Sequence, residues 1–152
     1  MYFSILLILY KIYLINKISC CIISKGGVVV VKIQESAENY LETILVLSKR
    51  KSDVHSIDIV NELGFSKPSI SRAVNLLKVN GYIDICNNGL IFLTEKGKNI
   101  AEQTYERHLL IKSFLIKLGV DEETAVNDAC RIEHVISPES FNKIKMHFEN
   151  MK

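Results

Sequence analysis

Three residues toward the end of the chain have side chains that can bind a metal ion together. Cys130, Glu133 and His134 lie at positions i, i+3 and i+4, so on a helix all three project from one face. A thiol, a carboxylate and an imidazole offer sulfur, oxygen and nitrogen donors to one divalent cation. The alternative is structural, because a buried free cysteine beside a Glu–His pair on the surface is a common arrangement. The elements that face a helix over residues 122–135 decide between these two interpretations.

The composition allows one domain, or two small modules that share a core. The chain has 152 residues, of which 48% are hydrophobic and 24% charged, so it can fold without a long disordered tract. The net charge of +2 is unevenly distributed. Residues 1–32 hold four lysines and no acid, which leaves 15 basic and 17 acidic residues in 33–152, a net charge of −2. Overall basicity is therefore no evidence for nucleic-acid binding, and only a local patch can supply it.

The cysteines and the N-terminal stretch bear on the cellular compartment. Cys20, Cys21, Cys86 and Cys130 form no Cys-x-x-Cys pair and no disulfide framework, which predicts free thiols in a reducing cytoplasm. Residues 1–31 are apolar, but lysines interrupt every run that a membrane helix would need. Neither the positive charge that precedes the apolar region of a signal peptide nor its small-residue cleavage site is clear. We interpret them as upstream DNA misread as protein, with translation beginning near residues 29–31. The alternative is a genuine hydrophobic N-terminal extension that tethers the protein to a membrane.

Two short helices joined by a tight turn are predicted in the first half of the chain, after a helix over residues 36–48. Ser56 is expected to cap a helix over 57–63, and Gly64 ends it where a left-handed conformation is needed. Ser66 then caps a second helix, which tolerates a proline in its first turn. This pattern predicts a helix-turn-helix.

The exposed face of the second helix carries hydroxyls, basic groups and an amide, without any acid. Its residues are Lys67, Ser69, Ser71, Arg72 and Asn75. An ordinary solvated helix face usually includes Glu or Asp. This chemistry therefore favours contacts with phosphates and base edges in a DNA major groove.

The remainder of the chain predicts a hairpin and three further helices. Residues 82–86 and 90–93 read as strands, and Asn88-Gly89 predicts a type I′ turn between them, so the hairpin is the wing of a winged helix. Thr94 begins a long helix that carries His108 and ends near Leu118; Asp121 and Ser137 begin the last two. The expected fold is mainly α, with a winged helix-turn-helix in 33–96 and an all-helical module in 97–152, which the family resemblance described next implies is a metal-binding and dimerisation module.

With these elements in order, five stretches give the chain a family resemblance. They are Glu38-Asn39-Tyr40-Leu41-Glu42, Ser66-Lys67-Pro68-Ser69-Ile70-Ser71, Leu93-Thr94-Glu95-Lys96-Gly97, Arg107-His108, and the run from Ala129 to Ser137. In them the chain resembles the diphtheria-toxin-repressor/manganese-transport-regulator family. The resemblance implies a cytoplasmic homodimeric repressor of metal homeostasis, without enzymatic activity, that binds palindromic DNA when activated by Mn(II) or Fe(II). It also implies the short architecture, without the extra C-terminal domain of the iron-type members.

The resemblance also implies a set of metal ligands, with two departures. Carried over by position, the ligands are Asn39, Glu42, His108, Cys130, Glu133 and His134. The manganese branch has Asp at position 39 and Glu at position 130, so this chain supplies three anionic ligands instead of four. A thiolate also prefers softer metals, which makes Co(II) or Zn(II) candidates beside Mn(II) and Fe(II). The accessory site of iron-type members is degraded, because Lys112 and Val126 stand where ligands are expected.

Two other functions remain open at this level. One is a winged-helix regulator that senses oxidants through Cys130. The other is a metallohydrolase built on Cys130, His108 and His134, although the chain has no phosphate loop, nucleophile elbow or helical His-Glu-x-x-His.

Overall fold

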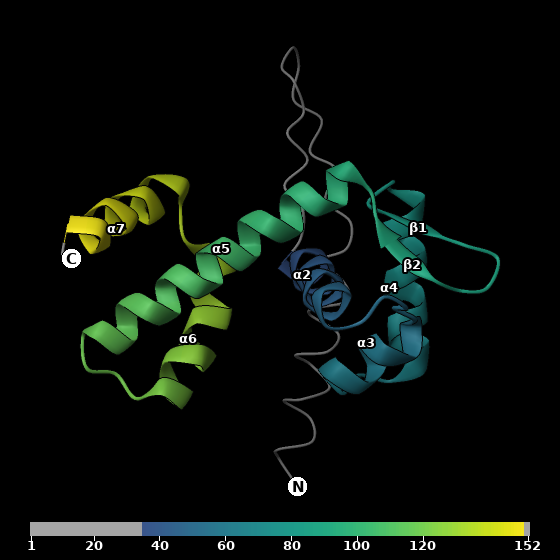
Figure 1. Cartoon of the computed structure of the whole chain (residues 1–152), viewed down its shortest axis with the longest axis horizontal. Coiled ribbons are helices and arrows are strands. Elements are labelled where there is room, and N and C mark those ends of the chain that lie inside the picture. The colour runs from purple at the N-terminus through teal and green to yellow at the C-terminus, as the bar shows by residue number, and fades with distance from the viewer. Residues whose placement is uncertain (1–34, 151–152) are drawn as a thin grey trace, which may run out of the picture. The chain divides into compact units, whose positions relative to one another are not determined.

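The structure, a computed structural model, describes residues 35–150 of the chain (Figure 1). It is mainly helical with one antiparallel hairpin, as predicted. The elements in chain order are α2 (Glu35–Arg50), α3 (Ser56–Leu63), α4 (Lys67–Val79), β1 (Ile83–Ile85), β2 (Ile91–Leu93), α5 (Glu95–Lys117), α6 (Glu122–Val135) and α7 (Pro138–Asn150). The leader expected at residues 1–31 lies outside the described residues. Within the described part, no helix combines the length and the apolarity needed to cross a membrane.

Helices α3 and α4 form the predicted helix-turn-helix. Gly64 ends α3 with a φ of 66°, in the left-handed region that glycine adopts without strain. Ser66 is the N-cap of α4, as expected. The prediction for Ser56 was wrong, because Ser56 is the first residue of α3 and His55 is the N-cap. The backbone N–H of His55 donates to Asp58 Oδ2 at 2.7 Å, which fixes the start of the helix one residue earlier.

Apolar side chains from four elements hold α4 in place. Leu41 and Ile44 of α2, Ile59 of α3, Ile70 of α4 and Ile83 of β1 are each at most 1% exposed. Burying an aliphatic side chain of this size stabilises a fold by about 1.5–3 kcal/mol. The face of α4 opposite Ile70 is therefore presented from a fixed core.

The hairpin is the predicted wing, but its turn is different. Strands β1 and β2 pair in register, with Ile85 opposite Ile91. A type I′ turn needs positive φ at two successive residues, and among the described residues only glycines have positive φ. Gly89 has a φ of 82°, and its N–H donates to the carbonyl of Cys86 at 2.9 Å. The loop therefore has three residues and ends on a left-handed glycine, which the Asn-Gly signal alone does not distinguish.

Helix α5 begins in direct contact with the backbone of the hairpin. The Thr94 hydroxyl accepts the Gly97 N–H at 3.2 Å, so Thr94 caps the helix as predicted. A Cβ built on Gly97 would overlap the backbone carbonyl of Tyr82. Glycine at position 97 thus allows α5 to leave the wing at this close distance.

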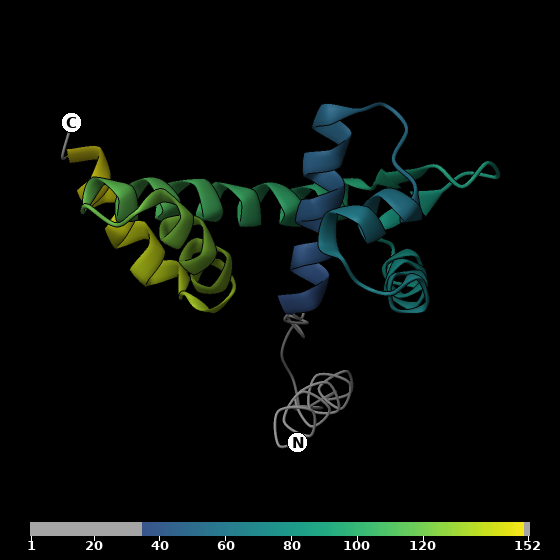
Figure 2. The ribbon, with the colours of Figure 1, turned by 90° about the horizontal axis from the view of Figure 1, so that it is seen from below.

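Helix α5 packs against both α2 and α6 (Figure 2), and so brings the two halves of the candidate ligand set together. The fully buried residues between α5 and α6 include Ala101 of α5 and Ala125 and Ala129 of α6. Side chains this small allow the helices to approach closely. Phe141 of α7 is also buried. The Arg107 guanidinium carbon lies over its ring, 6.0 Å from the ring centroid.

Candidate metal centre

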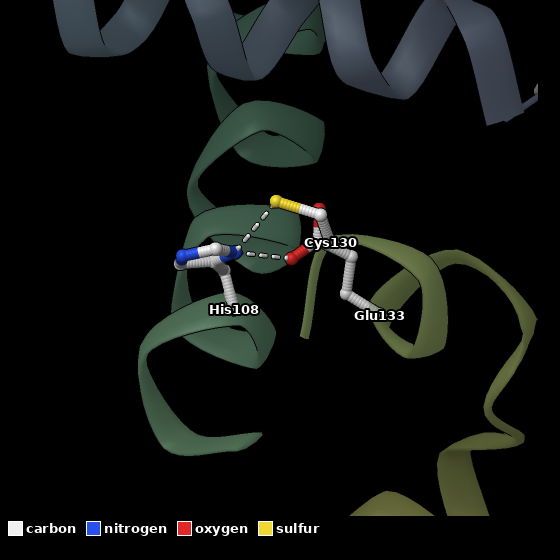
Figure 3. A group of neighbouring side chains, drawn as sticks. All are labelled: His108, Cys130 and Glu133. Carbon is white, nitrogen blue, oxygen red and sulfur yellow. Dashed lines mark hydrogen bonds and ion pairs between the residues drawn. The ribbon is translucent and has the colours of Figure 1, made fainter. Parts of the chain in front are cut away.

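Helices α5 and α6 bring three of the six predicted ligands into one cluster (Figure 3). His108 projects from α5, and Cys130 and Glu133 project from successive turns of α6 toward it. His108 Nδ1 lies 2.8 Å from Glu133 Oε2 and 3.7 Å from Cys130 Sγ. One donor atom from each residue lies within 4.8 Å of the other two, which is close enough for all three to approach one cation.

Glu133 lies at the centre of this cluster and is 1% exposed. Its two carboxylate oxygens face two different imidazoles. Oε2 faces His108 Nδ1, and Oε1 lies 3.3 Å from His134 Nε2. An ionised carboxylate this deeply buried needs compensating charge, and here the two histidines provide it.

The neighbours of His108 in this cluster favour its protonated form. Contacts with Cys130 and Glu133 raise the pKa of His108 to about 10, against the opposing effect of burial. His108 is thus an imidazolium at neutral pH. A metal ion that binds His108 must displace this proton.

Glu42 joins the cluster from α2. Burial, followed by the negative charge of Glu133, raises the pKa of the Glu42 carboxyl to about 7. When two carboxyl groups lie at short distance, repulsion between their negative charges raises the pKa of one of them. A dication near Glu42 and Glu133 would remove that repulsion, so the position of Glu42 fits the role implied by the resemblance.

His134 lies beside the cluster and is held by a residue that was not among the predicted ligands. His134 Nδ1 lies 2.9 Å from Glu38 Oε2, while its Nε2 faces Glu133. A local signal for Glu38 exists, because Glu38 and Glu42 stand at i and i+4 on one face of α2. That spacing does not reveal the partner, which is 96 residues away.

The described contacts of Asn39 lie within its own helix. Its side chain is exposed, and its Oδ1 accepts from Thr43 Oγ1 at 3.4 Å within its own helix. The same hydroxyl donates to the Asn39 backbone carbonyl at 2.8 Å. The residue supplies no charge, and no described contact directs it toward Glu133.

The donor set fits a divalent cation of borderline softness. Cys130 offers sulfur, His108 and His134 offer nitrogen, and Glu42 and Glu133 offer carboxylate oxygen. Such mixed sets suit Fe(II), Co(II) or Zn(II), whereas Mn(II) prefers oxygen. At the expected accessory site, Lys112 Nζ forms an ion pair with Glu122 Oε1 at 2.8 Å, so a cationic side chain occupies that position.

The predicted DNA-contacting residues lie along α4, away from its buried face. Lys67, Ser71, Arg72 and Asn75 are exposed. Ser69 is half-buried, and its hydroxyl lies 2.9 Å from that of Ser66 in the first turn of the helix.

Comparison with known families divides the chain into two matched parts. Residues 32–88 match the family described as iron dependent repressor, N-terminal DNA binding domain. Residues 94–152 match the family described as iron dependent repressor, metal binding and dimerisation domain.

Individual relatives agree with these matches. The chain is 35% identical over 109 residues to the HTH-type transcriptional regulator MntR of Bacillus subtilis (strain 168). This alignment covers 72% of the chain and 77% of the relative. It is 30% identical over 113 residues to the transcriptional regulator MntR of Escherichia coli O157:H7, covering 74% and 73%. A solved structure described as a manganese-dependent transcriptional repressor in complex with manganese has a TM-score of 0.68 at 25% identity. That alignment covers 73% of this chain and 51% of the other, so the chain spans about half the length of that protein.

Proposed function

We propose that a divalent cation bound between α2 and the α5–α6 pair switches on DNA binding by a homodimer. The premise is that the chain belongs to the iron-dependent repressor family of metal-dependent transcriptional regulators. The observation that carries the proposal is the cluster of His108, Cys130 and Glu133, which Glu42 and His134 adjoin. A member of this family is a transcriptional regulator and not an enzyme, so the metallohydrolase interpretation is withdrawn.

The proposed ligands come from both functional parts of the chain. We assign the DNA-binding domain to 33–96 and the metal-binding and dimerisation domain to 97–152. Glu42, with Asn39 as a further ligand, belongs to the first domain. His108, Cys130, Glu133 and His134 belong to the second.

The chain's own residues explain why metal would change the orientation of the two domains. Glu42 lies beside Glu133, and burial, followed by the negative charge of Glu133, raises the pKa of the Glu42 carboxyl. A bound dication supplies positive charge between α2 and α6. It therefore binds more tightly to the arrangement in which both carboxylates reach it, and shifts the population toward that arrangement.

DNA recognition follows from the exposed face of α4. In a homodimer, two copies of this helix held about one DNA turn apart enter successive major grooves of a palindromic site. The guanidinium, amide, ammonium and hydroxyl groups of Arg72, Asn75, Lys67, Ser69 and Ser71 suit contacts with phosphates and base edges. Packing of α4 against α2, α3 and β1 fixes where this helix points.

The metal is proposed from ligand chemistry. Cys130, Glu42 and Glu133 supply three negative charges when ionised, so two dications in one cluster would be incompletely compensated. One strongly bound cation is the expected stoichiometry, with a second bound weakly. The thiolate favours Fe(II), Co(II) or Zn(II) over Mn(II). The location of such a repressor is the cytoplasm, where free thiols stay reduced.

One observation supports a second candidate, a regulator that responds to oxidants. Cys130 is exposed, and its Sγ lies 3.7 Å from the His108 ring nitrogen. A sulfur exposed in this way is accessible to an oxidant. Peroxide-dependent release of DNA in the presence of a metal chelator would support this function in place of metal sensing.

A selection experiment tests the proposal directly. The full chain is incubated with a pool of randomised DNA duplexes in the presence of Mn(II), Fe(II) under anaerobic conditions, Co(II), Zn(II), or a chelator. We expect a palindromic sequence to be enriched with at least one metal and not with the chelator. Equal enrichment in all samples would refute metal activation.

A further inference from the structure

A buried ion pair connects the first turn of α2 to the last turn of α6. Glu38 Oε2 lies 2.9 Å from His134 Nδ1, and the two side chains are 18% and 7% exposed. Exposed ion pairs contribute little to stability, but a pair largely withdrawn from water is screened far less. This contact therefore constrains the His134 ring.

The two nitrogens of His134 have different partners. Nδ1 faces Glu38, and Nε2 lies 3.3 Å from Glu133 Oε1 on the side of the cluster. A neutral imidazole carries its proton on only one nitrogen, and the hydrogen bond made by that nitrogen determines which one is left as a donor to metal. A carboxylate behind a ligand histidine commonly fixes both its tautomer and its orientation.

We propose that Glu38 is a positioning residue that holds the proton of His134 on Nδ1, so that Nε2 is the atom presented to the metal beside Glu133. The inference rests on the proposed function. It adds a contact between α2 and α6 that does not pass through the metal, since Glu38 lies on α2 and His134 on α6.

Direct coordination by Glu38 is disfavoured by the geometry. Its carboxylate binds the nitrogen on the opposite side of the ring from Glu133. A cation between Nε2 and Glu133 would have the imidazole between itself and Glu38. Glu38 thus acts through His134.

The chain offers a matched control for the charge of Glu38. Glu35 also lies in the first turn of α2, and it acts on His134 through its negative charge. Glu35→Gln removes a carboxylate that interacts with the same helix N-terminus, and leaves the Glu38–His134 contact in place. Glu38→Gln removes the charge but keeps an oxygen acceptor, and Glu38→Ala removes both.

The test combines Zn(II) affinity with the NMR signals of the His134 ring nitrogens. Zn(II) is the probe because it is diamagnetic and binds nitrogen and sulfur. In the unaltered full chain loaded with Zn(II), we expect a slowly exchanging proton on Nδ1 and a metal-shifted Nε2. Glu38→Ala should lose the protected proton and bind Zn(II) about 10–100-fold more weakly, as for other carboxylates that orient a ligand histidine. Glu38→Gln should lose less, and Glu35→Gln should bind like the unaltered protein.

Three results would overturn the proposal. One is Zn(II) bound through Nδ1. The second is an unchanged Zn(II) affinity and Nδ1 signal in Glu38→Ala with native circular dichroism. Loss of one Zn(II) per subunit in that variant would also refute it, since Glu38 would then be a ligand itself. The NMR signals of the chain in chelator, at a pH where His134 is neutral, distinguish a failure of the positioning role of Glu38 from a failure of the proposed metal sensing. A protonated Nδ1 in a protein that binds no metal would refute metal sensing and leave the positioning of His134 intact.

Discussion

The metal cluster and the outer face of α4 are built in opposite ways. In the cluster, side chains from three helices contact one another, and Glu133 at its centre is 1% exposed. On α4, Lys67, Arg72 and Asn75 all come from one helix and point to solvent. The cluster owes its geometry to contacts between the functional residues, whereas the α4 face owes its geometry to the buried side of the same helix.

This difference predicts different consequences of mutation. Removing one member of the cluster leaves a buried charge without its partner, so neighbouring residues also change their protonation. Removing one residue of the α4 face leaves the fold unaffected and subtracts one contact with DNA. The following substitutions test that contrast, beginning with the largest expected effect.

Glu133→Gln and His134→Ala should abolish metal-activated DNA binding. Each change removes a donor from the cluster, and Glu133→Gln also removes the negative charge that, after the contact with Cys130, raises the pKa of His108. Footprinting with and without metal measures the activity. Sedimentation of the metal-free variants measures the dimer, which should persist because dimer contacts are expected to come from apolar surface. Monomeric metal-free variants would show that the two residues are structural.

Arg72→Ala should weaken DNA binding by about 1–3 kcal/mol if its guanidinium contacts a base, and should leave metal affinity unchanged. Asn75→Ala should behave in the same way. The measurement is a titration of the selected duplex and of variants changed at single positions. A loss that is uniform across sequences would assign Arg72 to phosphate. Unchanged affinity in both variants would mean that another face of α4 enters the groove.

The double variant Asn39→Asp, Cys130→Glu should bind Mn(II) more tightly, and with a second ion per subunit. Two added carboxylates supply hard oxygen donors and lessen repulsion between neighbouring dications. Calorimetric titration with Mn(II) and Zn(II) gives both affinity and stoichiometry. An unaltered chain that already binds two Mn(II) ions at full strength would contradict the charge argument.

The smallest predicted effect is the pH dependence of the metal-free protein. The pKa of His108 is raised from 6.5 to about 10, so the stability it contributes is full below pH 6.5 and is lost as pH rises through about 10. Glu42, raised from 4.5 to about 7, acts in the same direction between those values. Thermal unfolding in chelator should therefore show a fall in stability above pH 7 that His108→Gln lacks. Parallel profiles for the two proteins would contradict the assignment.

Local sequence patterns predicted most of the elements but not all of their connections. The caps at Ser66, Thr94 and Asp121, and the left-handed Gly64, depend on neighbouring residues and were confirmed. The N-cap at His55 was missed, because the Asp58 carboxylate that fixes it was not considered.

Long-range contacts explain what the sequence could not show at the site. The i, i+3, i+4 spacing predicted that Cys130, Glu133 and His134 lie on one face of α6. In the structure the Glu133 carboxylate contacts both His134 and His108. The role of Glu38 depends on α5 packing against both α2 and α6, which no local spacing encodes. The ligand role of Asn39 came from the resemblance, and remains a prediction.

The most direct test of the central claim compares DNA affinity and metal affinity in the same unaltered protein. Thermodynamic linkage requires that if the two metal ions of a homodimer together strengthen DNA binding by some factor, DNA strengthens the binding of those two ions by the same overall factor, the product of the two per-site factors. Titrations of the selected duplex at saturating Co(II) and in chelator give the factor for DNA binding, and Co(II) titrations with and without duplex give the per-site factor. We predict a per-site factor of about 5–150-fold, the usual range for coupled sites, and a DNA-binding factor equal to its square for two equivalent sites. Equal DNA affinity in Co(II) and in chelator would contradict the account.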